Sequence, residues 1–229
     1  MEYDHEPGVA PAHVTALAST TYKQLVGQSR AALERLLVGG ETPSLSGIVG
    51  YEYRGYNIAP TTALLGIRKF IKAFFTTHEG DVYGCNTPVA QNGLNGPWIA
   101  RPSESAPRRY AFFSVTPVDP EAQDNAYLHA LLIDYGRGGN PLCDPSRYLR
   151  DYLVRCVPGS DDLLLGKAYM AIGPARVPAS FFMLERYRPL SGPILLPGSG
   201  EPAISSRNPE RGGPTWRSYL PGSSTLPLA

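Results

Sequence analysis

Residues 47–57 read GIVGYEYRGYN, and this stretch decides which fold the rest of the chain is expected to complete. Tyr51, Tyr53 and Tyr56 alternate with polar residues and glycines, a spacing typical of a β-strand. Glycine inside a strand marks a bend or a close approach of neighbouring chain. We therefore predict that this segment is the first strand of a closed sheet. The alternative is an ordinary half-buried strand with a core helix behind it.

Further strand-like runs follow along the chain, separated by turn clusters such as QNGLNG and RPSESAP. The 23 prolines and 24 glycines exceed average usage and favour short strands joined by turns over a helix bundle. The additional predicted strands are 80–92, 97–101, 109–117, 126–135, 162–172 and 179–187. Together these runs predict a mainly β protein, an antiparallel barrel with flanking helices.

A helix is predicted before the first strand, within residues 17–40. Apolar residues including Leu25 and Leu33 approximate one face of this helix. Gly27 weakens its middle, and the Gly-Gly pair that starts at Gly39 ends it.

Two more helices are predicted to interrupt the strands. Residues 61–75, TTALLGIRKFIKAFF, carry apolar side chains at 64, 67, 71 and 74, which share one helix face. Residues 144–157, DPSRYLRDYLVRCV, begin with Asp144 as a natural N-cap and Pro145 at the first helical position. We therefore expect one helix directly after the first strand and another before the last two strands.

The later predicted strands are apolar on both faces. In 126–135, Leu128 and Leu132 share one face, while His129 lies on the other among further apolar residues. Such a strand is either buried under helices or part of a barrel with a lined interior. The last two predicted strands each carry one or two polar side chains at the end of a series of apolar ones. This arrangement is typical of a ligand cavity, and equally of a sheet where it meets solvent.

The chain divides into three predicted parts: an N-terminal arm and helix (1–43), a barrel domain (44–188) and a tail (189–229). The tail contains eight Pro, six Gly and seven Ser, a composition that cannot build a core of its own. If it is ordered, it lies against its own domain or a partner chain. Under the second alternative, residues 1–15 and 189–229 are the segments through which a protein partner would bind.

Composition excludes several classes of protein. The 229 residues suffice for one well-buried domain, and 42% hydrophobic content argues against a disordered chain. A net charge of +1 provides no field that would attract nucleic acid, so no nucleic-acid partner is expected. No window reaches the roughly 20 apolar residues of a membrane span, so no transmembrane segment is predicted.

The three cysteines, Cys85, Cys143 and Cys156, have no zinc-like spacing and are expected to be reduced thiols. The acidic N-terminus has no signal-peptide pattern. These features predict an intracellular protein, soluble or peripheral to an assembly, with an organelle as an open alternative.

No motif nominates a reaction. A phosphate-binding glycine loop, a GxSxG elbow, an HExxH pair and a CxxC pair are all missing from the sequence, so no metal site is predicted and the catalytic residues stay unknown. His129 is interpreted as a hydrogen-bonded core residue, with a haem ligand or a general base as alternatives. The candidate ligand-binding residues are Tyr53, Arg54, His129, Lys167, Tyr169 and Met183.

Four short motifs occur in order: GYEYRG at 50–55, GIRKF at 66–70, DDLLLGK at 161–167 and FFMLER at 181–186. Their order resembles the lipocalin-like (calycin) β-barrels, and within them the GXWXG-motif family of unknown function. Tyrosine stands where that motif has tryptophan, and the middle of the chain has no matching motif. The resemblance spans roughly residues 45–188 and implies a closed barrel with a pocket.

Such barrels typically bind hydrophobic small molecules, some bind haem or bilins, and a few act as cyclases or isomerases. The resemblance thus implies a lipid, isoprenoid or tetrapyrrole ligand bound without catalysis, with the cofactor itself unknown. The alternatives are an accessory subunit of a larger assembly, and an isomerase or cyclase in which apolar burial lowers the pKa of Lys167. The expected walls are Phe112, Leu128, Leu132, Met170, Phe181 and Met183, or their opposite-face neighbours.

Overall fold

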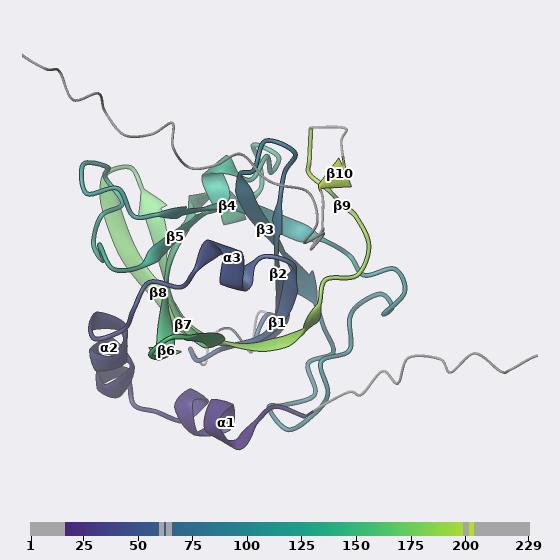
Figure 1. Cartoon of the computed structure of the whole chain (residues 1–229), viewed down its shortest axis with the longest axis horizontal. Coiled ribbons are helices and arrows are strands. Elements are labelled where there is room, and N and C mark those ends of the chain that lie inside the picture. The colour runs from purple at the N-terminus through teal and green to yellow at the C-terminus, as the bar shows by residue number, and fades with distance from the viewer. Residues whose placement is uncertain (1–16, 60–61, 63–65, 199–201, 204–229) are drawn as a thin grey trace, which may run out of the picture.

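Eight antiparallel strands close into a barrel in which each strand pairs with its sequence neighbour and β1 pairs with β8 (Figure 1). The computed structural model describes residues 17–59, 62, 66–198 and 202–203. Next-neighbour order is that of lipocalin-like barrels, so the predicted fold class is confirmed. The strands are β1 (Tyr51–Asn57), β2 (Lys69–Thr76), β3 (Val82–Pro88), β4 (Tyr110–Pro117), β5 (Leu131–Asp134), β6 (Leu149–Val157), β7 (Ser160–Ile172) and β8 (Ala175–Pro189).

The barrel interior is built by alternate residues of its strands, because successive side chains in a strand point to opposite faces. These inward side chains form one buried cluster that is rich in aromatic rings. Among the expected wall residues, Phe112, Phe181 and Met183 pack outside the barrel instead. The interior cluster includes their neighbours Phe113, Phe182 and Leu184, together with Tyr53, Phe70, Phe74, Ile133, Leu153 and Leu164.

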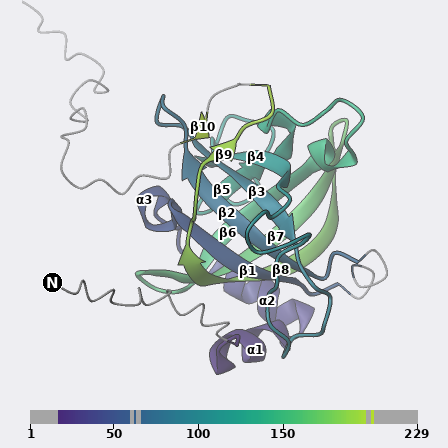
Figure 2. The same ribbon diagram turned by 90° about the vertical axis from the view of Figure 1, so that its right-hand side faces the viewer.

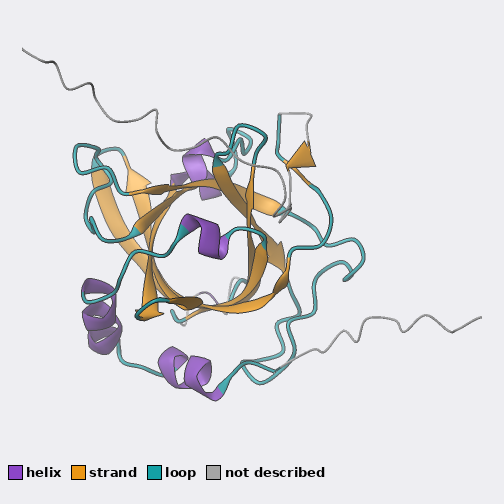
Figure 3. Cartoon of the chain, viewed as in Figure 1, coloured by secondary structure: helices purple, strands orange, loops and turns teal. Residues whose placement is uncertain are grey.

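A single helical turn, α3 (Leu45–Ile48), lies across one mouth of the barrel (Figure 3). The Ser44 side chain caps this turn by accepting a hydrogen bond from the Gly47 amide at 3.3 Å. Ile48 is fully buried and belongs to the interior cluster. The turn therefore closes this mouth with an apolar side chain.

Two helices, α1 (Thr20–Val26) and α2 (Arg30–Val38), form a layer outside the barrel (Figures 1 and 2). They are the helix predicted within 17–40, divided at Gly27, which is the C-cap of α1. Tyr22, Leu33 and Leu37 are buried beneath them against the outer faces of β6, β7 and β8. A second apolar core thus lies outside the barrel wall.

The helix predicted for 61–75 is wrong over residues 69–75, which belong to strand β2. Phe70 and Phe74 face the lumen, while Ile71 and Phe75 pack outside it. Both faces of this strand are therefore buried, and a two-sided apolar strand loses the alternation that distinguishes it from a helix.

The helix predicted for 144–157 is also wrong beyond its first turn. Asp144 does cap the chain before Pro145, but only the short 3-10 helix η2 (Pro145–Tyr148) follows. The remainder is strand β6, which pairs with β5 and β7. Tertiary pairing on both sides overrides the local helix signal.

The strand predicted for 126–135 shortens to β5, Leu131–Asp134. In the preceding loop Leu128 is 60% exposed, while Tyr127 and Ala130 pack in the core outside the barrel, so the apolar alternation there lines no lumen. The strand predicted for 97–101 is reduced to an isolated bridge between Val89 and Ala100. The remaining predicted strands are present with shifted ends.

The tail is described only at its start. Leu190 and Ile194 are buried outside β2, β3 and β4, and β9 (Ile194–Leu195) pairs with β10 (Pro202–Ala203). Residues 1–15 and most of 189–229 lie outside the described residues, so protein partners for them stay a prediction. No helix in the described part of the chain has both the length and the apolar character to cross a bilayer.

Candidate functional site

A polar cluster lies inside the otherwise aromatic lumen. It joins Lys72 of β2, Asn86 of β3, Tyr135 of η1 (Tyr135–Arg137) and Asp151 of β6. The Lys72 ammonium donates to the Tyr135 hydroxyl at 2.7 Å, and that hydroxyl donates to Asp151 Oδ2 at 3.1 Å. The ammonium and Asp151 Oδ2 are 3.8 Å apart, and Asn86 Nδ2 is 3.5 Å from the hydroxyl. We call these four residues the lumen cluster.

Strand register brings the lumen cluster together. Lys72 stands between Tyr53 on β1 and Asn86 on β3, and Asp151 is opposite Ile133 on β5. Tyr135 directly follows β5, so its side chain continues the inward series. Alternation and pairing alone therefore place a lysine and an aspartate on the inner face of the barrel.

Aromatic rings surround the ammonium. Lys72 Nζ lies 4.3 Å from the centroid of the Phe113 ring. It lies 5.1, 5.3 and 5.7 Å from the centroids of Tyr135, Phe182 and Phe70. Only 1% of Lys72 and 2% of Asp151 are exposed. Ring faces attract a cation, and the carboxylate balances its charge in surroundings of low dielectric.

Burial changes the acidity of both charged members. It lowers the pKa of Lys72 to about 8, against the opposing charge of Asp151. It raises the pKa of Asp151 to about 6, against the charge of Lys72 and the hydrogen bond from Tyr135. Burial and the Asp151 charge place the pKa of Tyr135 well above its ordinary value. Moving a proton from the ammonium to the carboxylate thus costs far less here than in water.

Two further features mark the lumen cluster as unusual. Asp151 Oδ1 is buried, and no described residue hydrogen-bonds to it. Ala111, whose carbonyl accepts from Asn86 Nδ2 at 3.3 Å, has a φ of 47°, which non-glycine residues adopt rarely and at a cost in backbone energy. Unpaired buried polar atoms and strained residues concentrate at functional sites.

The lumen cluster lies toward the mouth opposite α3. Asp151 is close to the start of β6 at Leu149, and Asn86 pairs with Tyr110, the first residue of β4. Tyr110, Leu149 and Ala168 are partly exposed and pack on the interior cluster. The lumen cluster is therefore nearer to this mouth than to the one that α3 covers.

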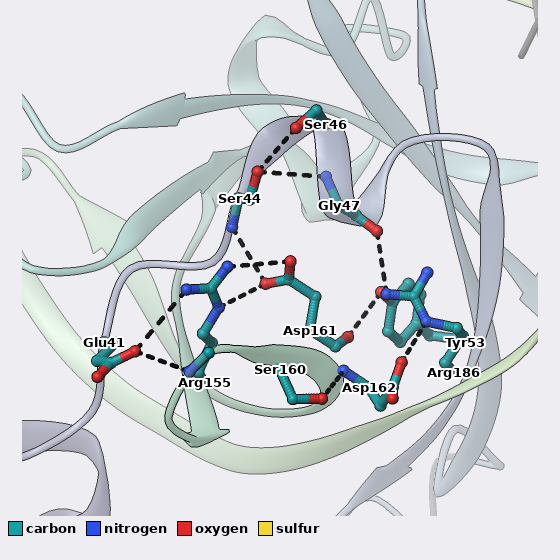
Figure 4. Close-up of polar contacts among 11 residues, drawn as sticks. Glu41, Ser44, Ser46, Gly47, Tyr53, Arg155, Ser160, Asp161, Asp162 and Arg186 are labelled. Carbon is teal, nitrogen blue, oxygen red and sulfur yellow. Dashed lines mark hydrogen bonds and ion pairs between the residues drawn. The ribbon is translucent and has the colours of Figure 1, made fainter. Parts of the chain in front are cut away.

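A polar network fixes α3 across the other mouth (Figure 4). Asp161 accepts from the Ser44 amide at 3.1 Å and from two nitrogens of Arg155 at 2.7 and 3.0 Å. The Tyr53 hydroxyl donates to the Asp161 carbonyl at 2.8 Å, and Arg186 donates to the Gly47 carbonyl at 3.0 Å. Tyr53, a predicted ligand-binding residue, thus faces the lumen but holds the closed end of the barrel.

The other predicted site residues lie outside the lumen. Arg54 pairs with Glu185 at 3.1 Å, and Met183 packs in the outer core under α1 and α2. His129 is in the loop before β5, where its Nε2 is 2.9 Å from the Leu37 carbonyl. The structure therefore does not bring these three to one pocket inside the barrel.

Lys167 and Tyr169 are brought together on the outer face of β7. Lys167 Nζ is 2.8 Å from both carboxylate oxygens of Glu34 and from the Tyr127 hydroxyl, which is itself 3.1 Å from the Tyr169 hydroxyl. Burial alone would lower the pKa of Lys167, but hydrogen bonds to Glu34, Tyr127 and Tyr169 raise it above its ordinary value. The expected lowering of this pKa is wrong, because α2 supplies a carboxylate.

Two hollows lie at the wall of the barrel. A cavity of about 200 Å³ at the edge of β7 and β8 is lined by Leu33, Ile58, Lys167, Ala168 and Phe181 among others. Ala168 also pairs with Asp151 across the strands. A wider polar groove of about 670 Å³ runs over β4, β5 and β6, where Arg150 is paired with Asp124 and Asp134. Asp124 in the same groove also pairs with Arg176.

Sequence reasoning misses the lumen cluster because three of its members lie in segments with helical spacing or at the end of an apolar run. A signal for it does exist in the sequence. In KFIKAFF, residues 69–75, a lysine interrupts an apolar stretch, and in LRDYLV, residues 149–154, an aspartate does the same. Once both stretches are strands, these charges must lie on a buried face.

Comparison of the chain with protein-family models, curated proteins and solved structures found no match. Within the described residues, no group of three or more His, Cys, Asp or Glu side chains is placed to hold a metal ion. What the lumen cluster offers is a cation, a carboxyl group and two neutral donors among packed aromatic side chains.

Proposed function

We propose that the barrel binds a small, mainly apolar molecule in its lumen, with one oxygen-bearing group of that molecule hydrogen-bonded to Lys72. The observation that carries this proposal is Lys72, a lysine that is only 1% exposed and whose ammonium lies 4.3 Å from the centroid of the Phe113 ring. Ligand sites combine apolar walls with a few oriented polar groups, and the lumen has this composition.

The ion pair of Lys72 and Asp151 is not explained by its contribution to the stability of the fold. Two buried opposite charges are often less stabilising than apolar side chains of the same volume, because desolvation offsets their attraction. In this lumen the ion pair is also loose, since the ammonium is 3.8 Å from Asp151 Oδ2. A ligand oxygen that accepts from Lys72, or a ligand hydroxyl that donates to Asp151 Oδ1, would complete the hydrogen bonding.

A compact ligand fits better than a tetrapyrrole. Large side chains, among them Phe74, Phe113 and Phe182, already occupy the lumen. His129, the candidate haem ligand, lies outside the barrel. A short aliphatic chain or a single ring with a carboxylate, hydroxyl or carbonyl group is therefore the ligand class we propose, and it would enter at the mouth opposite α3.

The resemblance of residues 45–188 to the GXWXG-motif family supports the same proposal. The eight strands pair in the next-neighbour order of lipocalin-like barrels. Two of the motifs that carry the resemblance supply residues of the interior cluster: Phe70 from GIRKF and Phe182 from FFMLER. We propose this kinship on those motifs together with the fold.

The test uses two six-carbon probes, hexanoate and hexan-1-ol, and saturation-transfer NMR of the full chain. We expect both to bind, with hexanoate tighter. Lys72→Met should weaken hexanoate by about tenfold or more, which corresponds to about 1.4 kcal/mol. Lys23→Met, a change on the outer helix α1, is the matched control and should leave both affinities unchanged. Equal hexanoate binding by wild type and a folded Lys72→Met variant would contradict the proposal.

A further inference from the structure

The geometry points to a chemical role for Lys72 that goes beyond hydrogen bonding. We infer that Lys72 forms an imine with an aldehyde or ketone ligand in the lumen, and that Tyr135 and Asp151 move the protons of this step. The inference rests on the proposed function, because it names the carbonyl compounds as the ligand class of the same site.

The arrangement of the three groups carries the inference. Tyr135 stands between the amine and the carboxyl group, 2.7 Å from Lys72 Nζ and 3.1 Å from Asp151 Oδ2. A proton can pass from the ammonium to the hydroxyl oxygen while the hydroxyl proton passes to the carboxylate. The result is a neutral amine, which is the nucleophilic form of lysine.

Lys69, on the same strand, provides an internal comparison. Its ammonium lies outside the lumen and donates to the oxygens of Asn92, Gly93, Gly96 and Pro97 at 2.5 to 3.1 Å. Burial lowers the pKa of Lys69 to about 8 as well. Both ammonium groups lie near an aromatic ring, Lys69 at 3.9 Å from the Trp98 centroid and Lys72 at 4.3 Å from that of Phe113. Their hydrogen bonding separates them where acidity does not: four oxygens accept from Lys69, whereas Lys72 donates to one hydroxyl and has Asp151 Oδ2 at 3.8 Å.

The step balances without an oxidant or reductant. The Lys72 nitrogen attacks the carbonyl carbon, and one amine proton moves to the former carbonyl oxygen to give a carbinolamine. Asp151, protonated in the first transfer, returns its proton to that hydroxyl group, and water leaves. The products are a protonated imine, the Asp151 carboxylate beside it as counter-ion, and one water molecule.

The acid–base properties of the site support this sequence. A pKa of about 8 leaves Lys72 with a deprotonated fraction near neutral pH that is roughly a hundredfold larger than that of a solvated lysine. A pKa of about 6 lets Asp151 accept and return a proton in the same range. The apolar surroundings also disfavour the water that would hydrolyse the imine.

The experiment is reductive trapping with hexanal as the probe. The full chain is incubated with hexanal and sodium cyanoborohydride, and the adduct, equal in mass to hexanal less one oxygen atom, is mapped by peptide mass spectrometry. The chain has four lysines, Lys23, Lys69, Lys72 and Lys167, and the α-amine of Met1 is the one other primary amine, so adduct is compared at five sites. Hexan-1-ol, which has no carbonyl group, serves as the competitor.

We expect the amount of adduct at Lys72 to exceed the amount at each other lysine by roughly tenfold or more. Hexan-1-ol should reduce the adduct at Lys72. Lys72→Met should abolish this adduct and Lys23→Met should leave it unchanged, with thermal melting as the check on folding. In urea the four lysines should react alike, because the selectivity depends on the fold.

Adduct confined to other lysines, or no adduct at all, would overturn the inference. The two proposals fail separately. If hexan-1-ol and hexanoate bind by NMR while no Lys72 adduct forms, the ligand site stands and the imine does not. If the probes do not bind and no adduct forms, both proposals fall.

Discussion

At Gly166 the wall of the barrel has no room for a side chain. A Cβ there would lie 2.0 Å from Cζ of Phe182, and the same holds at Gly55 against Phe70 and at Gly84 against Phe113, with 2.3 and 2.2 Å to the nearest ring atoms. Gly166→Ala should therefore lower the free energy of unfolding by about 1–3 kcal/mol, since the ring must leave its place. Urea denaturation measures this change.

Gly27 is the matched control for that substitution. A methyl group added there would have a backbone oxygen as its nearest neighbour, at 3.6 Å, and the φ of Gly27 is −80°. Gly27→Ala should be neutral or stabilising by up to about 1 kcal/mol through the unfolded state. An equal loss in both variants would show that the Phe182 contact has no energetic role.

The charges of the lumen cluster give the protein a distinctive pH dependence. The pKa of Asp151 is raised to about 6, so the stability this group contributes is full below its unfolded value near 4 and is lost as pH rises through 6. The pKa of Lys72 is lowered to about 8, so its contribution is full above the unfolded value near 10 and is lost as pH falls through 8. Both contributions are therefore missing between pH 6 and 8.

Replacing the charged groups by apolar ones tests this account. The variant Lys72→Met/Tyr135→Phe/Asp151→Val should be as stable as wild type or more stable, by about 1–4 kcal/mol, near pH 7. Its advantage should shrink toward about pH 5 and about pH 9, where wild type regains one contribution or the other. Urea unfolding at these three pH values decides the matter, and an advantage that does not vary with pH would contradict the pKa assignments.

Among the elements, α3 depends most clearly on one side chain. Asp161 holds the Ser44 amide and Arg155 together, and a side chain at Gly47 would collide with it. Asp161→Ala should lower the free energy of unfolding by about 1–3 kcal/mol, because it removes the acceptor of two partly buried donors, the Ser44 amide and Arg155. Hydrogen exchange of the amides in 44–50 should accelerate at the same time.

The neighbouring residue supplies the control. The Asp162 side chain is 66% exposed and pairs with Arg186 near the surface. Asp162→Ala should change stability by less than about 1 kcal/mol and leave exchange in 44–50 unchanged. If both variants behaved alike, the turn α3 would be held by its apolar contact through Ile48 and not by Asp161.

The sequence is sufficient for some elements and misleading for others, for identifiable reasons. β1 is predictable because tyrosines are spaced by polar residues and glycine, and β8 because a run of aromatic and aliphatic residues, 181–184, lies between Pro178 and Pro189. β2 and β6 resemble helices in sequence because both of their faces are buried, one by the lumen and one by outer layers or neighbouring loops. Helical spacing of apolar residues is then accidental, and only long-range pairing identifies the strand.

For the whole molecule, the same two-layer arrangement explains which site residues could be predicted. Lys167, Tyr169 and Met183 stand beside apolar residues in the sequence, but they face the core beneath α1 and α2. A shift of one residue in strand register exchanges the inner and outer faces of a strand. When both faces are apolar, the sequence pattern does not show which residues point inward. Lys72 and Asp151 can be recognised as lumen residues only once the pairing of the eight strands is known.

A further layer covers the opposite side of the barrel, where Leu190 and Ile194 pack on Phe75, Cys85 and Phe112. A chain that ends at Pro189 should be less stable than one that ends at Gly198 by about 3 kcal/mol or more, since each buried aliphatic side chain contributes about 1.5–3 kcal/mol.

Iodoacetamide labelling provides a second measurement: Cys85 is fully buried, and burial raises its pKa to about 12, so it should react only in the shorter chain. Cys143, which is exposed, should react equally in both chains and calibrates the labelling. Equal stability and equal protection of Cys85 would mean that residues 190–198 do not cover the barrel in solution.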